Sequence, residues 1–143
     1  MSREEVGYRL RLAEGFLAEA RLNNQHELWR SCVDNSQLAA ENAAKATLAL
    51  AGPVTRTHNP AVVLLDALKK GSFPQELEKA VRKIAECAAL LGPQVHSESD
   101  YGDEANWRTP WELFDKTKAA EALELAETAV TLSQQIIQQQ GQP

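Results

Sequence analysis

The stretch SQLAAENAAKATLALAG, at residues 36–52, is the part of the sequence that most strongly determines the fold. It contains seven alanines, and alanine has the highest helix propensity of all residues. The alanines fall on neighbouring faces of a helix, where small side chains let helix axes approach one another closely. Gly52 and Pro53 then follow in the order that ends a helix. We therefore predict a helix over residues 27–50, packed tightly against other helices or against a second copy of the chain.

The rest of the chain also has the pattern of helices and not of strands. Apolar and polar residues do not alternate over any stretch, and good helix formers dominate the sequence. A capping box pairs an N-cap serine with Glu or Gln three residues later, and it predicts helix starts at Ser2 and Ser72. Further helices are expected over residues 60–70 and 117–139. The sequence therefore predicts an all-α fold.

Residues 92–116, GPQVHSESDYGDEANWRTPWELFDK, have no clear helical period, and we predict a long loop there. Loops of this length inside a compact domain tend to be functional or mobile. Trp107 and Trp111 lie in this segment, and we expect them to anchor it on the helices. The alternative is a stacking platform for a base or a partner helix, with Arg108 as its cation. The acidic residues of the segment match no calcium-binding loop, so no metal site is predicted.

Composition and charge restrict the class of protein. The chain has 143 residues, and we interpret residues 1–143 as a single domain with its own core. Lys and Arg total 15 against 20 Asp and Glu, and the net charge of −5 argues against a binder of the DNA backbone. No apolar leader or membrane-length run occurs, so we expect a cytoplasmic protein without membrane contact. Cys32 and Cys87 lack metal-ligand spacing and are expected to be buried thiols, and no cofactor is predicted.

Three strings along the chain resemble those of one protein family. The first is the alanine-rich stretch itself, in which the matching residues are Gln37, Ala39, Ala40, Glu41, Lys45 and Ala46. Asn42 replaces the lysine that usually follows the glutamate. The second string is RTHNPAVVLL at residues 56–65, and the third is WRTPWELFDKTKAAEALELAE at residues 107–127. In these strings the chain resembles HEPN domains (higher eukaryotes and prokaryotes nucleotide-binding domains) of the prokaryotic stand-alone type.

This resemblance implies an antiparallel four-helix up-and-down bundle with an additional short helix, a fold that usually forms homodimers. Members of the family often lie beside a minimal nucleotidyltransferase in a toxin–antitoxin pair. Some members are metal-independent ribonucleases, which use an Arg and, a few residues later, a His near the start of the last long helix. Metal-free cleavage of RNA by its own 2′-hydroxyl needs His as acid or base and a fixed cation for the phosphate.

The ribonuclease motif is not found at its expected position. The string DYGD at residues 100–103 corresponds to the Arg-Tyr-Pro-Asp of active members, so an acid stands where the cation would be. No histidine occurs after His96, and the chain lacks the Tyr-x-Tyr element of a related form. Arg21 and His26 have the ribonuclease spacing but lie in the turn after the first helix. We therefore predict no catalytic residue, and the sequence favours a role other than that of an enzyme.

Arg56 and His58 form a candidate site for a nucleotide or a phosphate. In one interpretation Asn59 and Pro60 only begin a helix, and His58 holds the preceding loop in place. In the other, Arg56 and the free backbone N–H groups of that helix start bind a phosphate, although Pro60 removes one donor. Three further candidates for the same ligand lie in the predicted loop: His96, Tyr101 and Arg108.

Glu41 and Lys45 are one helical turn apart, with the acid first, which is the favourable order for an ion pair. We predict this pair on a polar strip of the second helix. The alternative is that Gln37, Glu41 and Lys45 line a dimer cleft.

The function expected from the sequence is that of a non-catalytic HEPN-type homodimer. It would act as the partner of a nucleotidyltransferase-like protein of the toxin–antitoxin type, or as an accessory that binds a nucleotide or RNA. One alternative is a metal-independent endoribonuclease toxin with an atypical site at Arg56, His58 or Arg108. A second alternative is a purely structural dimerisation module.

Overall fold

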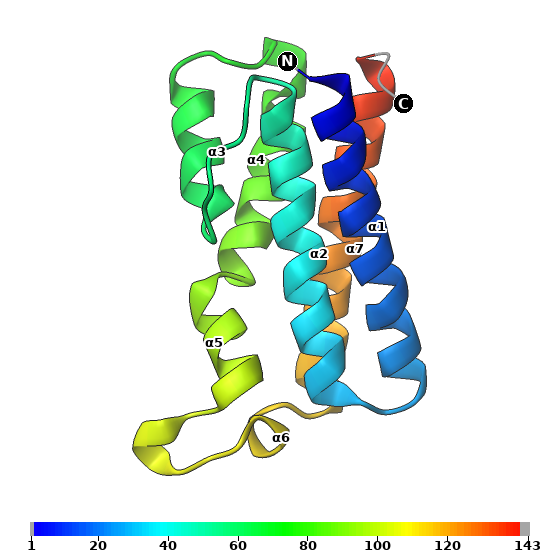
Figure 1. The fold of residues 1–143 in the computed structure, drawn as a ribbon, viewed down its shortest axis with the longest axis vertical. Helices are drawn as coiled ribbons and strands as arrows, with labels where there is room; N and C mark the ends of the chain where they lie inside the picture. The colour runs from blue at the N-terminus through cyan, green and yellow to red at the C-terminus, as the bar shows by residue number, and fades with distance from the viewer. Residues whose placement is uncertain (1, 141–143) are drawn as a thin grey trace.

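The computed structural model describes residues 2–140, and in this range it contains seven α-helices, one short 3-10 helix and no strand (Figure 1). Successive helices of the bundle run in opposite directions, so α1 (Arg3–Gln25) begins and α7 (Lys116–Gln139) ends at the same end of the molecule (Figure 1). A shorter helix, α3 (Pro60–Lys69), packs outside the bundle against α4 (Gln75–Leu90). The predicted antiparallel four-helix bundle with an additional short helix is confirmed. Its four helices are α1 (Arg3–Gln25), α2 (Trp29–Ala49), α4 (Gln75–Leu90) and α7 (Lys116–Gln139).

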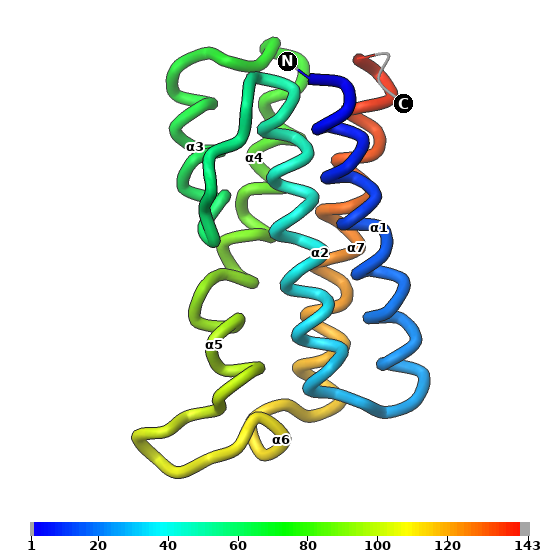
Figure 2. The backbone as a smooth tube through the Cα atoms, in the orientation of Figure 1, coloured from blue at the N-terminus to red at the C-terminus, as the bar shows by residue number. Residues whose placement is uncertain are grey.

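The segment that was expected to be a long loop before the last helix contains helices of its own. They are α5 (Pro93–Tyr101), the 3-10 helix η1 (Glu104–Asn106) and α6 (Pro110–Leu113). The backbone tube shows α5 continuing the column of α4 after a break (Figure 2). The sequence pattern did not predict α5 because only Ser99 of this helix is buried, so α5 has no apolar period.

Gly92 and Pro93 make the break between α4 and α5. A Cβ atom on Gly92 would lie 2.9 Å from the carbonyl oxygen of Ala89, so only glycine allows the backbone to pass this closely. Pro93 has no N–H group to continue the ladder of α4, but it fits the first turn of a new helix. The break sends α5 along α2, which it contacts.

α2 is the central helix of the fold, and it contacts α1, α3, α4, α5, α6 and α7. Fifteen of its 21 residues are buried. Ala39, Ala43 and Ala46 are among those with no exposed surface, and their short side chains allow the neighbouring helices to pack closely. The predicted close packing of the alanine-rich helix is confirmed, and its packing partners lie in the same chain.

The core consists of buried aliphatic side chains and a few internal polar links. Thr47 on α2 and Ser133 on α7 are fully buried, and their hydroxyl oxygens lie 3.1 Å apart. Both hydroxyls donate to the carbonyl oxygen of Ala43, which ties the two helices together. Cys32 and Cys87 are free and buried, as predicted, and burial raises the pKa of both thiols. Within residues 2–140, no helix combines the length and the apolar character needed to cross a membrane.

The predicted helix starts agree with the structure at α1 and differ at α4. Ser2 is the N-cap of α1, and its hydroxyl accepts a hydrogen bond of 3.1 Å from the backbone N–H of Glu5. α4 begins at Gln75 without a side-chain cap, so Ser72 is not its N-cap. The backbone N–H of Ser72 instead donates to Ala67 in the turn that ends α3.

α1 and α3 end in the same hydrogen-bonded turn, but only α3 has glycine at its left-handed position. In α3 that residue is Gly71, with a φ of 71°. In α1 it is Glu27, with a φ of 59°. The N–H of Glu27 donates to Asn24 and the N–H of Leu28 donates to Asn23, which is the pattern of a Schellman motif. The Cβ atom of Glu27 therefore makes this turn less stable than glycine would.

We expect Glu27→Gly to raise the free energy of unfolding by about 0.5–1 kcal/mol, because glycine adopts the left-handed conformation without the Cβ clash. Glu27→Ala is the matched control, since it removes the same side chain but keeps the Cβ atom. Urea denaturation of both variants measures the difference. Equal stability of the two variants would contradict the strain assigned to Glu27.

Candidate functional site

A strip of three polar side chains runs along the otherwise alanine-rich α2. The amide of Gln37 donates to Glu41 Oε1, and Lys45 Nζ donates to Glu41 Oε2, both at 3.2 Å. Gln37, Glu41 and Lys45 are 1%, 7% and 9% exposed. The predicted ion pair of Glu41 and Lys45 is confirmed, and it is nearly buried. The dimer-cleft role of the strip stays a prediction, and within one chain the strip is already largely covered.

Two histidines that are far apart in the sequence meet beside this strip. His58 lies in the connection between α2 and α3, and His96 lies on α5. Their rings are stacked, with centroids 6.1 Å apart and an angle of 11° between the planes. His96 Nδ1 lies 3.0 Å from Gln37 Oε1. The structure thus brings His96 to the strip through Gln37 and brings His58 to His96.

The hydrogen bonds of Gln37 determine which nitrogen of His96 carries a proton. The NH₂ group of Gln37 donates to Glu41, so the oxygen of the same amide faces His96. An amide oxygen only accepts hydrogen bonds, and His96 Nδ1 must therefore be the donor. This leaves His96 Nε2 for a second partner, and Asp100 Oδ2 lies 3.9 Å from it.

Charged side chains of α2 and α5 form a network on the far side of His96. Arg30 donates from Nε to the carbonyl oxygen of Ser99 at 2.5 Å and from its terminal nitrogen to Asp100 Oδ1 at 3.1 Å. The same nitrogen lies 3.6 Å from Asp34 Oδ2. The hydroxyl of Ser99 donates to Asp34 Oδ1 at 3.1 Å. Arg30, Asp34 and Ser99 were not predicted as site residues, because their role depends on the packing of α5 on α2.

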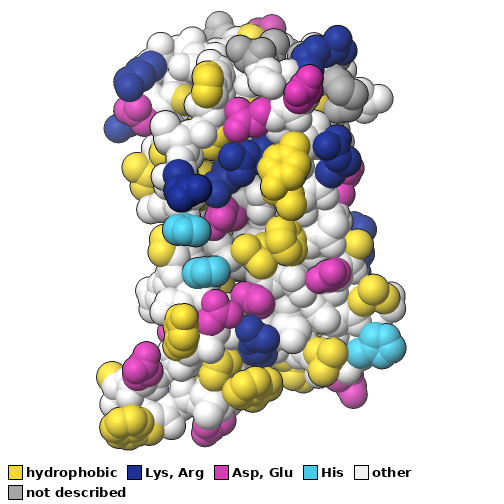
Figure 3. Space-filling view, viewed as in Figure 1, with side chains coloured by type: hydrophobic (Ala, Val, Ile, Leu, Met, Phe, Trp, Pro, Cys, Tyr) yellow, Lys and Arg dark blue, Asp and Glu magenta, His cyan; other side chains and the backbone are white. Residues whose placement is uncertain are grey.

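The opposite side of the histidine pair is basic. Figure 3 shows two histidine side chains together on one face of the molecule, with basic side chains above them and acidic ones directly below. Arg56 is exposed and forms no hydrogen bond or ion pair with the described residues 2–140. Asn59 is the N-cap of α3 and Pro60 its first residue, as predicted, but no side chain caps this helix. The N–H of Asn59 donates to Thr57 Oγ1 at 3.0 Å. An unpaired cation and an uncapped helix start therefore lie next to His58 in the sequence.

Comparison with known proteins assigns the family. The family model of the HEPN domain matches residues 6–136, a range that includes the polar strip, both histidines and the charged network. The chain belongs to the HEPN domain family. The structure is similar to the crystal structure of TT1696 from Thermus thermophilus, with a TM-score of 0.66 and 20% sequence identity. The match covers 92% of this chain and 97% of that one, and it concerns the fold. No curated protein matches the sequence.

Two of the predicted site residues of this HEPN domain are not joined to the histidine pair. Tyr101, at the end of α5, is 69% exposed. Arg108 donates to the carbonyl oxygen of Glu112 at 2.9 Å. In the part of the chain that the structure describes, no hydrogen bond, ion pair or ring contact links either side chain to His58 or His96. Arg21 likewise pairs with Glu127 and not with His26.

The expectation that Trp107 and Trp111 anchor the segment on the bundle is wrong for Trp107, and Trp111 only borders a hollow beside Leu28 and Trp29 at the start of α2. Trp107 and Trp111 are 89% and 72% exposed. The segment contacts α2 through hydrogen bonds of Ser99 and Asp100 with Arg30 and Asp34. Within the segment, Asp103 and Arg108 exchange two backbone hydrogen bonds of 2.8 and 2.9 Å. Gly102, with a φ of 76°, lies against this pair, because a Cβ atom there would be 2.2 Å from the carbonyl oxygen of Arg108. The role of the tryptophans as a stacking platform stays a prediction.

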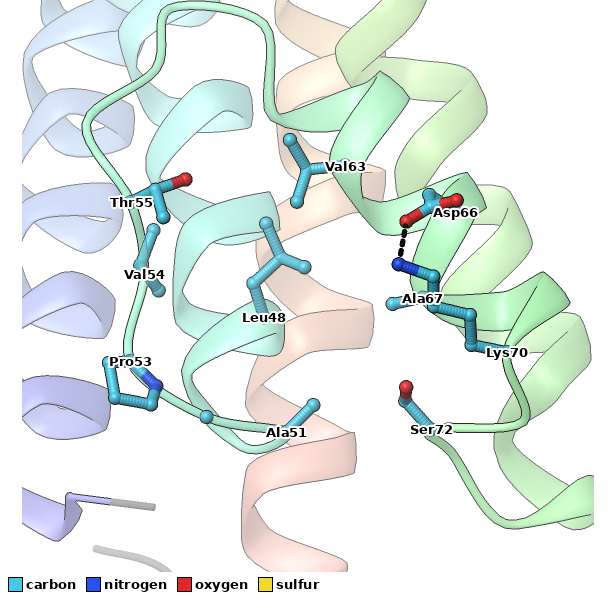
Figure 4. A pocket seen from close by; sticks show the side chains of 11 residues that line it. Leu48, Ala51, Pro53, Val54, Thr55, Val63, Asp66, Ala67, Lys70 and Ser72 are labelled. Carbon is cyan, nitrogen blue, oxygen red and sulfur yellow. Dashed lines mark ion pairs between the residues drawn. The ribbon is translucent and has the colours of Figure 1, made fainter.

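A separate hollow of about 230 Å³ lies between the end of α2 and α3 (Figure 4). Leu48, Val54 and Val63 form its apolar part. Lys70 at its rim pairs with Asp66 at 2.9 Å, and the hydrogen bond and charge of Asp66 raise the pKa of Lys70. The ammonium group of Lys70 therefore already has an anionic partner, unlike the guanidinium of Arg56.

We expect Lys45→Met to lower the free energy of unfolding by about 3 kcal/mol, because the carboxylate of Glu41 stays buried without its cation. Lys79→Met, at an exposed position of α4, is the control and should change the stability by less than about 0.5 kcal/mol. Urea denaturation measures both. If the two variants unfold alike, the buried ion pair does not stabilise the fold.

Proposed function

We propose that this HEPN domain is a non-catalytic homodimer that binds a nucleotide or single-stranded RNA at Arg56, His58 and His96. It serves as the partner of a nucleotidyltransferase-like protein or as an RNA-binding accessory. The observation that carries the proposal is the unpaired Arg56 and the uncapped start of α3 next to the stacked histidines. The family itself is one of nucleotide- and RNA-related helical domains.

The chemistry of this corner suits a phosphate followed by a base. The guanidinium of Arg56 and the free N–H groups of the first turn of α3 are donors of the kind that bind phosphate oxygens. The exposed ring of His58 offers a face on which a base can stack. The apolar hollow in Figure 4 lacks such an unpaired cation, which supports Arg56 as the point of attachment.

The absence of catalysis is supported by the groups around His96. A metal-free ribonuclease needs a cation beside the scissile phosphate, but the nearest charged partner of His96 is the carboxylate of Asp100. Arg30, the cation of this network, is held by Asp100 and Asp34. His96 Nδ1 is held by Gln37. A phosphate placed at His96 Nε2 would meet the carboxylate of Asp100, and the arginine of this network is already paired.

The pairing of chains is supported by the resemblance to HEPN homodimers and by apolar side chains that a single chain leaves exposed. Tyr8 on α1 and Trp111 on α6 are among these side chains. Large aromatic side chains of this kind are enriched at protein interfaces.

We expect Arg56→Ala to weaken the binding of fluorescently labelled single-stranded RNA by about tenfold or more, because a charge-assisted hydrogen bond contributes about 1.5–3 kcal/mol. Fluorescence anisotropy at constant salt measures the affinity. Arg82→Ala is the matched control, since Arg82 is an exposed arginine on α4. Equal weakening by both variants would indicate only a general effect of net charge and would contradict the site.

The paired histidines favour one second candidate, a metal-independent endoribonuclease with an atypical site. The same RNA samples test it, because intact RNA after incubation with the wild type supports a non-catalytic role. Cleavage that His96→Gln abolishes would replace the proposal with this alternative.

We expect the purified protein to elute as a dimer of about 32 kDa, twice the chain mass of 15.8 kDa. Size-exclusion chromatography with light scattering measures the mass over a series of protein concentrations. A mass of one chain at every concentration would contradict the homodimer.

A further inference from the structure

Asp34, His96 and Asp100 form a cluster of metal-ligand type that the sequence did not reveal. One ligand atom of each residue lies within 4.8 Å of the others. Asp34 belongs to α2, whereas His96 and Asp100 are one turn apart on α5. The packing of α5 on α2 therefore completes a set of one imidazole and two carboxylates.

Hydrogen bonds from neighbouring side chains hold two members of this set. Gln37 accepts the hydrogen of His96 Nδ1, so Nε2 is the ring nitrogen that faces Asp100. Metal-bound histidines usually have this arrangement, in which the other ring nitrogen donates to a fixed acceptor. Ser99 donates to Asp34 Oδ1 and thereby fixes that carboxylate from the side.

Arg30 contacts the two carboxylates without covering the whole cluster. Its guanidinium binds Asp100 Oδ1, and Asp100 Oδ2 is the oxygen that faces His96. Asp34 and Asp100 carry two negative charges and Arg30 carries one positive charge, so the cluster has a net charge of −1. Asp100 is exposed and Asp34 half-buried, which leaves a path for an ion and room for the carboxylates to turn toward it.

We propose that Asp34, His96 and Asp100 bind a divalent first-row transition-metal ion. Such ions accept imidazole nitrogen together with carboxylate oxygen, whereas Mg²⁺ and Ca²⁺ prefer oxygen ligands alone. A bound zinc ion lies about 2.0–2.2 Å from such nitrogen and oxygen atoms, so the carboxylates must close in by a small rotation of their side chains. Water completes the coordination. The ion lies on the acidic side of the histidine pair, and its binding is a property of the chain beyond the proposed RNA contact.

The test is isothermal titration of the full chain with ZnCl₂ and MnCl₂, with MgCl₂ and CaCl₂ as comparison salts. We expect one Zn²⁺ per chain and no measurable binding of Mg²⁺ under the same conditions. His96→Gln and Asp100→Asn should each weaken the binding of Zn²⁺ by about tenfold or more. His26→Gln is the control and should leave the affinity unchanged, because His26 lies at the end of α1, outside the cluster. Thermal melts of the metal-free proteins establish that each variant is folded.

Failure of the wild type to take up Zn²⁺ would overturn the proposal, whatever the variants do. Equal affinity of the wild type and folded His96→Gln would also overturn it, as would loss of binding in His26→Gln. The titration contains no RNA and no nucleotide. Its result therefore stands apart from the test of the proposed function.

Discussion

The buried carboxylate of Glu41 is the constraint on which the centre of this fold depends. A charge in the middle of an alanine-rich helix must be paired and hydrogen-bonded, since an isolated buried charge is strongly destabilising. Lys45 pairs with one oxygen and the amide of Gln37 with the other. The side-chain oxygen of Gln37 then needs a hydrogen-bond donor, and His96 on α5 supplies it. The break at Gly92 matters for this reason, because it lets α5 reach α2.

The hydrogen bonds that link Glu41, Gln37 and His96 also give the site two sides of opposite charge. His96 is fixed by Gln37 through Nδ1, and on one side of its ring stacks His58, which follows the unpaired Arg56 by two positions in the sequence. Asp34 and Asp100 lie on the other, with Arg30 between them. A phosphate is attracted to the first side and a cation to the second. The proposed RNA contact and the proposed metal site therefore use different faces of one histidine pair.

Part of the site was predictable, and the reasons for the rest are physical. Arg56, His58 and His96 were expected as candidates, and the structure joins the two histidines. Arg30 and Asp34 on α2 and Ser99 on α5 were missed because they contact one another across more than 60 positions of the sequence, and no local pattern indicates such contacts. The His-x-x-x-Asp spacing of His96 and Asp100 was a usable signal. This spacing was not recognised, because α5 is a polar helix without an apolar stripe and was expected to be a loop.

The sequence alone determined the all-α class, the central alanine-rich helix, the caps at Ser2 and Asn59–Pro60 and the likeness to HEPN domains. These features depend on helix propensity, apolar period and terminal residues, which act over a few neighbouring positions. Only the tertiary structure decided that His58 stacks on His96 and that Trp107 and Trp111 face outward. It also joined His96 to Gln37 across 59 positions. Contacts of this kind depend on the angle at which α5 leaves α4, and that angle results from how the whole chain packs against α2.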